Sequence, residues 1–105
     1  MKILLDEGVP KIIQRRLTEL SISNVEEMGW RGIKNGELLD LMAGQFQILI
    51  TADKNLPFQQ NLKKRQVSAI ILPANDVPTV VQLLPEIEQA LAMIAPGESI
   101  ELSRS

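Results

Sequence analysis

Residues 46–57 read FQILITADKNLP, and this stretch decides the fold. Residues 47–51 form a short run of β-branched and aliphatic side chains, which is typical of a buried strand. Asp53 follows at the point where that strand ends and a loop begins. Ligands of open α/β sheets usually bind in the groove outside the carboxyl ends of the strands. The stretch therefore predicts a central strand with a functional loop directly after it.

A second strand of the same kind opens the chain. Lys2–Leu5 is largely apolar and is followed by Asp6 and Glu7. Adjacent parallel strands lie about 4.8 Å apart, so we expect Asp6 and Asp53 to stand close together. Like charges at that range raise a pKa or move apart unless a cation lies between them. We therefore predict a paired carboxylate site for a divalent metal that activates water for attack on a phosphodiester. Glu37, at the start of the next helix, is the expected third ligand.

Simpler explanations compete with this one. An acid at the end of a strand often does no more than cap the following helix, and this alternative stays open for both aspartates. Asn35 and Asn55 each precede an expected helix, so N-capping competes with a direct role at the site. Lys34 and Lys54 flank the acidic groove, where they can hold the phosphates of a bound strand. Their alternative is solvation on the surface.

The composition narrows the chemistry. The chain contains no cysteine and no histidine. This excludes disulfides, thiolate zinc ligands, imidazole bases and histidine-ligated metals within the chain. A metal would be held by oxygen, which favours Mg²⁺ or Mn²⁺ over Zn²⁺. Trp30 and Phe58 are the large aromatics near loops, and we expect packing for both ahead of stacking on a base.

Length and charge set broader bounds. A chain of 105 residues that is 45% hydrophobic predicts one domain covering residues 1–105. A net charge of −2 gives no bulk attraction to nucleic acid or membrane, so any binding of RNA must be local. The opening residues MKILLD turn acidic too early for a signal peptide, and no apolar run approaches about 20 residues. We expect a cytoplasmic protein without a membrane partner.

The rest of the chain alternates helices and strands, which predicts an α/β fold with helices on both faces of a mostly parallel sheet. Right-handed crossovers favour the strand order 2-1-3-4, with an additional C-terminal edge strand. The first half of the chain predicts a helix after Pro10 with Ile12, Ile13, Leu17 and Leu20 on its apolar face, a break at residues 21–24, a short edge strand at 25–28 and a helix from about Asn35 to Gly44. After the central strand we expect a short polar helix from Pro57 to residues 63–65 and a strand at 68–72. The last helix is opened by Asp76 and Pro78 and either kinks or truly begins at Pro85, and an edge strand follows at 99–102.

Three motifs resemble those of a known family. LLDEGVP at 4–10, WRGIKNGELL at 30–39 and LITADKNLP at 49–57 are similar to the short PIN-like proteins of the DUF5615 group, small relatives of PIN-domain and Mut7-C-type ribonucleases. The resemblance covers nearly the whole chain. It implies a PIN-like three-layer fold and a Mg²⁺- or Mn²⁺-dependent acidic site that cuts RNA, with Asp6 and Asp53 carried over from the motifs. Several such proteins are toxins of toxin–antitoxin pairs, which implies an antitoxin protein as a partner.

The chain departs from that pattern at two positions. Many of these proteins have an aspartate where this chain has Asn35, and many read Asp-x-Asp-Phe where this chain has Asn55 two residues after Asp53. Each departure removes an anionic ligand, and Glu37 partly substitutes for the first. Two functions follow as hypotheses: a metal-dependent endoribonuclease, or a weak or inactive PIN-like module that acts by binding RNA or a protein partner.

A third hypothesis is a phosphoacceptor domain of the receiver type. An acidic pair after the first strand and Asp53 after the third also fit that scheme. Receivers, however, use a lysine after their fifth strand, and no lysine occurs beyond Lys64. The sequence leaves open the RNA target, the metal that is used and the oligomeric state, a homodimer included.

Overall fold

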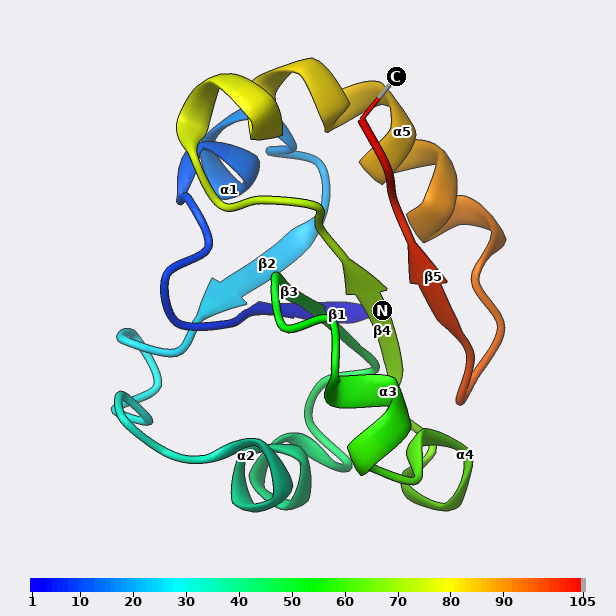
Figure 1. The fold of residues 1–105 in the computed structure, drawn as a ribbon. Coiled ribbons are helices and arrows are strands. Elements are labelled where there is room, and N and C mark those ends of the chain that lie inside the picture. Colours follow the sequence, from blue (N-terminus) through cyan, green and yellow to red (C-terminus); the bar gives the residue numbers. More distant parts are fainter. Residues whose placement is uncertain (105) are drawn as a thin grey trace.

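A five-stranded, all-parallel sheet forms the middle layer of the protein, whose computed structural model describes residues 1–104 (Figure 1). The spatial order of the strands is β2-β1-β3-β4-β5. This confirms the predicted order and the C-terminal edge strand. The strands are β1 (Lys2–Leu5), β2 (Ser21–Asn24), β3 (Ile48–Thr51), β4 (Ser68–Ile71) and β5 (Ser99–Glu101).

Helices cover both faces of the sheet. Figure 1 shows α1 and α5 on one side, with α2, α3 and α4 on the other. The predicted three-layer α/β architecture is therefore confirmed. Within residues 1–104, no helix is long and apolar enough to cross a bilayer. The helices are α1 (Ile12–Arg16), α2 (Asn35–Met42), α3 (Leu56–Gln59), α4 (Leu62–Arg65) and α5 (Val77–Met93).

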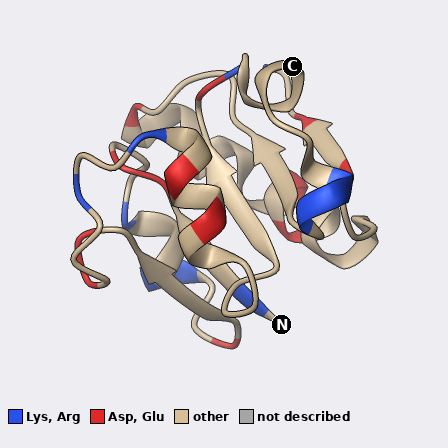
Figure 2. Ribbon diagram, turned by 90° about the horizontal axis from the view of Figure 1, so that it is seen from below, with Lys and Arg blue, Asp and Glu red and all other residues tan. Residues whose placement is uncertain are grey.

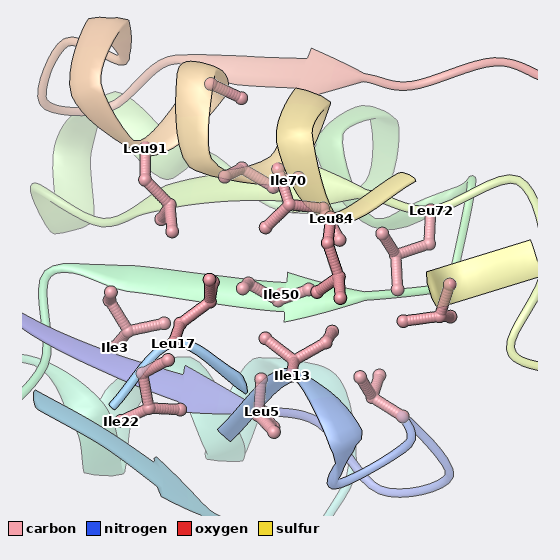
Figure 3. Packing of buried hydrophobic residues seen from close by; sticks show 14 of the residues in the cluster. Ile3, Leu5, Ile13, Leu17, Ile22, Ile50, Ile70, Leu72, Leu84 and Leu91 are labelled. Carbon is pink, nitrogen blue, oxygen red and sulfur yellow. The ribbon is translucent and has the colours of Figure 1, made fainter. Parts of the chain in front are cut away.

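Alternate residues of the central strands supply two separate hydrophobic cores. Ile48 and Ile50 of β3 pack toward α1 and α5, the side drawn in Figure 3. Leu49, between them, packs toward Met42 of α2. Strands of parallel sheets are buried on both faces, which explains why β3 reads as a continuous apolar run. This burial leaves the polar residues that follow the strand as the first ones able to contact a ligand.

The second strand lies earlier in the chain than predicted. Residues 21–24 form β2, and residues 25–28 form a turn, so the prediction of a break followed by a strand at 25–28 was wrong. Asn24 can be buried in a strand because Gln14 and Glu27 hydrogen-bond its side chain. These partners come from other elements, so the local pattern does not reveal them. Helix α1 also ends at Arg16, four residues before Leu20.

Two further differences concern the helices. The expected short polar helix is divided into α3 and α4, because Asn61 caps α4 by accepting a hydrogen bond from the backbone N–H of Lys64 at 3.0 Å. Helix α5 begins at Val77 behind the Asp76 cap and continues through Pro85. Pro85 therefore does not mark the start of the last helix.

Gly97 is the glycine with the closest backbone neighbour, and its replacement by alanine should destabilise the fold. Its φ is +79°, and a Cβ there would lie 2.7 Å from Cα of Lys63. A left-handed L-residue costs about 1–2 kcal/mol, and the forced separation of the two backbones adds to that cost. We expect Gly97→Ala to lower the melting temperature by roughly 10 °C or more, as measured by circular dichroism.

Gly44→Ala is the matched control. Gly44 has a φ of +84°, but a Cβ at this position would have no neighbour within 4 Å, so this variant carries the backbone cost alone. We expect it to lose only this backbone cost of about 1–2 kcal/mol. An equal loss in the two variants would show that the contact between Gly97 and Lys63 has no energetic weight.

Candidate functional site

The two aspartates lie at the same edge of the sheet. Asp6 directly follows β1, and Asp53 comes two residues after β3, the strand that pairs with β1. The backbone N–H of Asp6 donates to the carbonyl of Ile50 at 2.9 Å, which holds the end of β1 against β3. The carboxyl ends of adjacent parallel strands thus bring together two acids that are far apart in the chain.

Thr51 links the two aspartates. Its hydroxyl donates to Oδ2 of Asp6 at 2.7 Å and accepts from the backbone N–H of Asp53 at 3.1 Å. Thr51 is 1% exposed, so its hydroxyl needs protein partners. Thr51 had no predicted role at the site. The sequence did contain a signal for this role, a threonine as the last residue of a buried strand. A buried hydroxyl at that position needs hydrogen-bond partners, and the loops that follow the strands can supply them.

Asp6 is held in a partly buried position where its charged form is disfavoured. Burial raises the pKa of the Asp6 carboxyl above its ordinary value. Hydrogen bonds from Thr51 and from the backbone N–H of Glu7, at 2.8 Å, oppose that rise, while the charges of Asp53 and Glu7 add to it. Among residues 1–104, ionised Asp6 therefore has no positively charged partner, and a cation or a proton would compensate its charge.

Replacing Asp6 by asparagine should therefore stabilise the metal-free protein at neutral pH. A carboxyl whose pKa is raised in the folded state stabilises the fold at a pH below its ordinary pKa of 3.8. This stabilisation is lost as the pH rises through the pKa of the folded state. We expect Asp6→Asn to melt at a higher temperature than wild type at pH 7, and the difference to disappear under acidic conditions. Thermal unfolding in EDTA across the pH range measures this.

Asp76 provides the opposite case. The hydroxyl and backbone N–H of Thr79 donate to the Asp76 carboxylate and lower its pKa. Its contribution is present above the ordinary value of 3.8 and is lost as the pH falls through the lowered value. Asp76→Ala should consequently reduce the melting temperature at pH 7. A rise for Asp76→Ala, or a fall for Asp6→Asn, would contradict the assigned environments.

The second aspartate is held by two asparagines. Nδ2 of Asn35 donates to Oδ2 of Asp53, and the backbone N–H of Asn55 donates to Oδ1 at 3.0 Å. Asn35 is the first residue of α2 rather than its N-cap, and neither Asn35 nor Asn55 caps a helix through its side chain. Side-chain capping was therefore the wrong explanation for both residues, although Asn55 does occupy the N-cap position of α3. Asn35 instead joins the start of α2 to the loop after β3.

Glu37 does not join the two aspartates. It is exposed in the first turn of α2, and among residues 1–104 no three acidic side chains gather closely enough to hold a metal together. Asp40, three residues after Glu37, is also on the surface, where its carboxylate lies 3.5 Å from the guanidinium of Arg65. Arg65 also donates to the carbonyl of Gly36 at 3.0 Å, so α4 is fastened to α2. Figure 2, seen from below, shows α2 with its acidic residues and α4 with its basic residues on the same side of the protein.

Two lysines lie beside the site. Lys34 directly precedes Asn35 and Lys54 directly follows Asp53, so both flank the hydrogen bond that joins those residues. Within residues 1–104, neither lysine forms an ion pair. Their ammonium groups are therefore available to an anion next to the aspartates.

The two loop aromatics behave differently. Trp30 packs edge-on against Phe46, with ring centroids 6.1 Å apart, so packing is confirmed for Trp30. Phe58 of α3 is 84% exposed, so packing was the wrong prediction for Phe58. The first turn of α3 is bonded to the loop after β3, through the Phe58 N–H and the carbonyl of Asn55 at 3.0 Å. An exposed ring thus follows the site loop directly.

Glu7 has a structural role that the sequence did not reveal. Its Oε1 accepts a hydrogen bond from the backbone N–H of Gly32 at 2.7 Å. This bond holds the loop of residues 29–32, which has a glycine at each end and precedes α2, against the end of β1. Because Asn35 begins α2 just after that loop, Glu7 helps to place the Asn35 side chain.

The donor set suits a hard divalent cation. Each carboxylate oxygen of Asp6 and Asp53 accepts one hydrogen bond from the protein, which leaves lone-pair capacity on all of them. Mg²⁺ is usually bound through one or two carboxylates together with waters and substrate phosphates. Two linked aspartates with raised proton affinity at Asp6 therefore fit Mg²⁺ or Mn²⁺ without a third acid.

No family model, curated protein or solved structure matches the chain. What the protein does must therefore be inferred from its own residues and their geometry.

Proposed function

We propose that the protein is a metal-dependent endoribonuclease of the PIN-like type, in which Asp6 and Asp53 hold Mg²⁺ or Mn²⁺. The observation that carries this proposal is the pair of aspartates on adjacent strand ends, joined through Thr51 and without an arginine or lysine partner among residues 1–104. Structural acids are normally neutralised by a basic side chain or by full solvation. This partly buried pair has neither, which is the arrangement expected of a cation site.

The surrounding residues would orient the acids and the substrate. A bound ion would supply an activated water and stabilise charge that develops on the phosphate. Thr51 and Asn35 restrict the rotation of the two carboxylates through the hydrogen bonds that they make. Lys34 and Lys54 would bind phosphates on either side of the cleaved bond. The chain has no histidine, so proton transfer falls to water or to a carboxylate.

Single-stranded RNA is the best match for this surface. The net charge of −2 argues against broad attraction to a duplex, whereas two local lysines suffice to hold a short backbone segment. The exposed ring of Phe58 offers a face on which an unpaired base can stack. A toxin of a toxin–antitoxin pair is one biological setting for such an activity, in line with the resemblance of the motifs.

A specific observation favours the second candidate, a weak or inactive module that acts by binding RNA or an antitoxin. The neutral side-chain amide of Asn35 donates a hydrogen bond to Asp53, at a position where the family that the motifs resemble often has an acid. The amide satisfies one oxygen of Asp53 without a cation, so the site needs a metal less than a triple-acid site would. Binding of RNA without cleavage is the outcome that this arrangement predicts.

Cleavage of a labelled single-stranded RNA with Mg²⁺, Mn²⁺ or EDTA separates the two candidates. The nuclease proposal requires cleavage that depends on metal, together with a rise in melting temperature as the ion is added. RNA binding that is equally strong in EDTA, with no cleavage in either metal, supports the binding module instead.

A further inference from the structure

The two edges of the sheet differ in how their outward backbone groups are bonded. On β2, alternate residues face β1, which leaves Ile22 and Asn24 pointing outward. Gln14 Nε2 donates to the carbonyl of Ile22 at 2.8 Å, and Glu27 Oε1 accepts from the N–H of Asn24 at 3.2 Å. The carbonyl of Asn24 accepts from the N–H of Met28 at 3.3 Å. Three of the four outward groups of Ile22 and Asn24 are thus bonded within the protein, and only the N–H of Ile22 has no partner among residues 1–104.

The β5 edge is open. The carbonyl of Glu98 and the N–H of Leu102 bond to β4 at 3.0 and 2.8 Å, so the residues that alternate with them, Ser99 and Glu101, point away from the sheet. Both are exposed. Among residues 1–104, no group hydrogen-bonds to the N–H or C=O of either residue. Proteins usually protect such an edge, as this one does at β2.

We propose that β5 pairs antiparallel with β5 of a second copy of this chain, forming a symmetric dimer with one continuous sheet. Identical strands that meet about a two-fold axis perpendicular to the sheet must run antiparallel. With the axis at Ile100, Ser99 of one copy faces Glu101 of the other. Each such pair exchanges both backbone hydrogen bonds, so every open N–H and C=O of Ser99 and Glu101 gains a partner.

The side chains fit this register. Ile100 would lie opposite Ile100 of the second copy, on the face where it already packs against the core beneath α5. Glu101 would face a serine, so no like charges oppose each other directly. Arg104 would lie diagonal to Glu98 of the second copy, within reach of a long side chain. Arg104 is exposed, and its present partner, Asp76 at 3.6 Å, is also on the surface, so the exchange is open to it.

This match is the reason to choose a second copy over another extended peptide. The open groups of β5, its apolar residue Ile100 and the flanking charges of Glu98 and Arg104 complement those of a second copy in a single register. The strand is only three residues long, so the contact area is small. We therefore expect a weak dimer whose population rises with protein concentration. The dimer is independent of the proposed nuclease activity, because the paired aspartates follow β1 and β3.

Sedimentation velocity over a range of concentrations, combined with amide hydrogen exchange, tests the dimer. In the wild-type chain, the fraction of dimer should grow with concentration, and exchange at Ser99 and Glu101 should slow in parallel. Exchange at the outward amide of Ile22 on β2 should not change. A chain that stays monomeric, or a dimer without slower exchange at Ser99 and Glu101, overturns the proposal.

Glu101→Pro provides the matching variant. Proline removes an outward N–H that β4 does not use, and it forces Ile100 toward the extended conformation that it already has. Losing this donor from both copies should raise the dimer Kd at least roughly ten-fold. Glu101→Gln keeps the donor and should leave the Kd nearly unchanged. Dimerisation of Glu101→Pro with the wild-type Kd overturns the proposal, and the exchange experiment decides the matter if that variant does not fold.

Discussion

Asp53→Asn should lower the rate of metal-dependent RNA cleavage by roughly a hundred-fold or more, because a metal site contributes several kcal/mol of transition-state stabilisation. The substitution is nearly isosteric, and an asparagine oxygen can still accept the hydrogen bond from Asn35. The other oxygen becomes an amide nitrogen that cannot accept from the N–H of Asn55, so the melting temperature in EDTA is measured beside the activity. A loss of activity without a lower melting temperature reflects the loss of the charge rather than of the fold. Binding of Mg²⁺ at a hundred times its Kd should stabilise the folded wild-type protein by about 2.7 kcal/mol and so raise its melting temperature. The variant should lose this rise.

Two further variants make the Asp53 result specific. Glu86→Gln removes an exposed acid from α5, on the opposite face of the sheet from α2, and should leave both cleavage and the thermal shift as in wild type. Glu37→Gln asks whether the exposed glutamate of α2 joins the ligand set when metal and RNA are bound. If wild type and Asp53→Asn respond alike to Mg²⁺ and cleave alike, the proposed nuclease site is refuted.

Asn35→Asp should make the protein depend on metal for its stability. The new carboxylate would take the place of the amide that donates to Asp53, which replaces a hydrogen bond by a repulsion between like charges. We expect a loss of about 2 kcal/mol in EDTA at neutral pH, which corresponds to roughly 10 °C in melting temperature. Because a third acid strengthens a cation site, Mg²⁺ should restore most of this loss and increase cleavage.

Asn61→Asp is the matched control for the added charge. Asn61 caps α4 by accepting from the N–H of Lys64, and an aspartate caps a helix equally well. This variant should show neither the loss in EDTA nor an additional gain with Mg²⁺. If Asn35→Asp is destabilised to the same extent with and without metal, then Asn35 has a structural role only, and the second candidate function gains support.

The predictions that held came from local patterns. The largely apolar stretches at residues 47–51 and Lys2–Leu5 each identified a buried strand, because a strand packed on both faces has consecutive buried aliphatic residues, here Ile48–Ile50 and Ile3–Leu5. The order of these strands followed from the handedness of crossovers. Asp6 and Asp53 could then be placed at one edge from the sequence alone, since both follow strands that run in the same direction.

The predictions that failed depended on hydrogen-bond partners that the local sequence pattern does not show. Asn35 looked like an N-cap because it precedes a helix, but its side chain bonds to Asp53, eighteen positions later. Residues 21–24 looked like a break because two serines and an asparagine are polar. Gln14 and Glu27 make that segment a strand by hydrogen-bonding the buried Asn24. Glu37 is exposed in α2 and does not group with the aspartates among residues 1–104, so its role as a ligand of a bound metal stays a prediction.

The amino-acid sequence by itself determined the layered parallel fold, the absence of cysteine and histidine chemistry, and the two acids at one end of the sheet, because burial and strand direction are read from neighbouring residues. Only the tertiary structure decided that Thr51 joins those acids, that Asn35 donates to one of them, and that the outward groups of β5 stay open while most of those of β2 are bonded. The physical reason is that a polar group's behaviour depends on which distant donor or acceptor the fold brings within hydrogen-bond range.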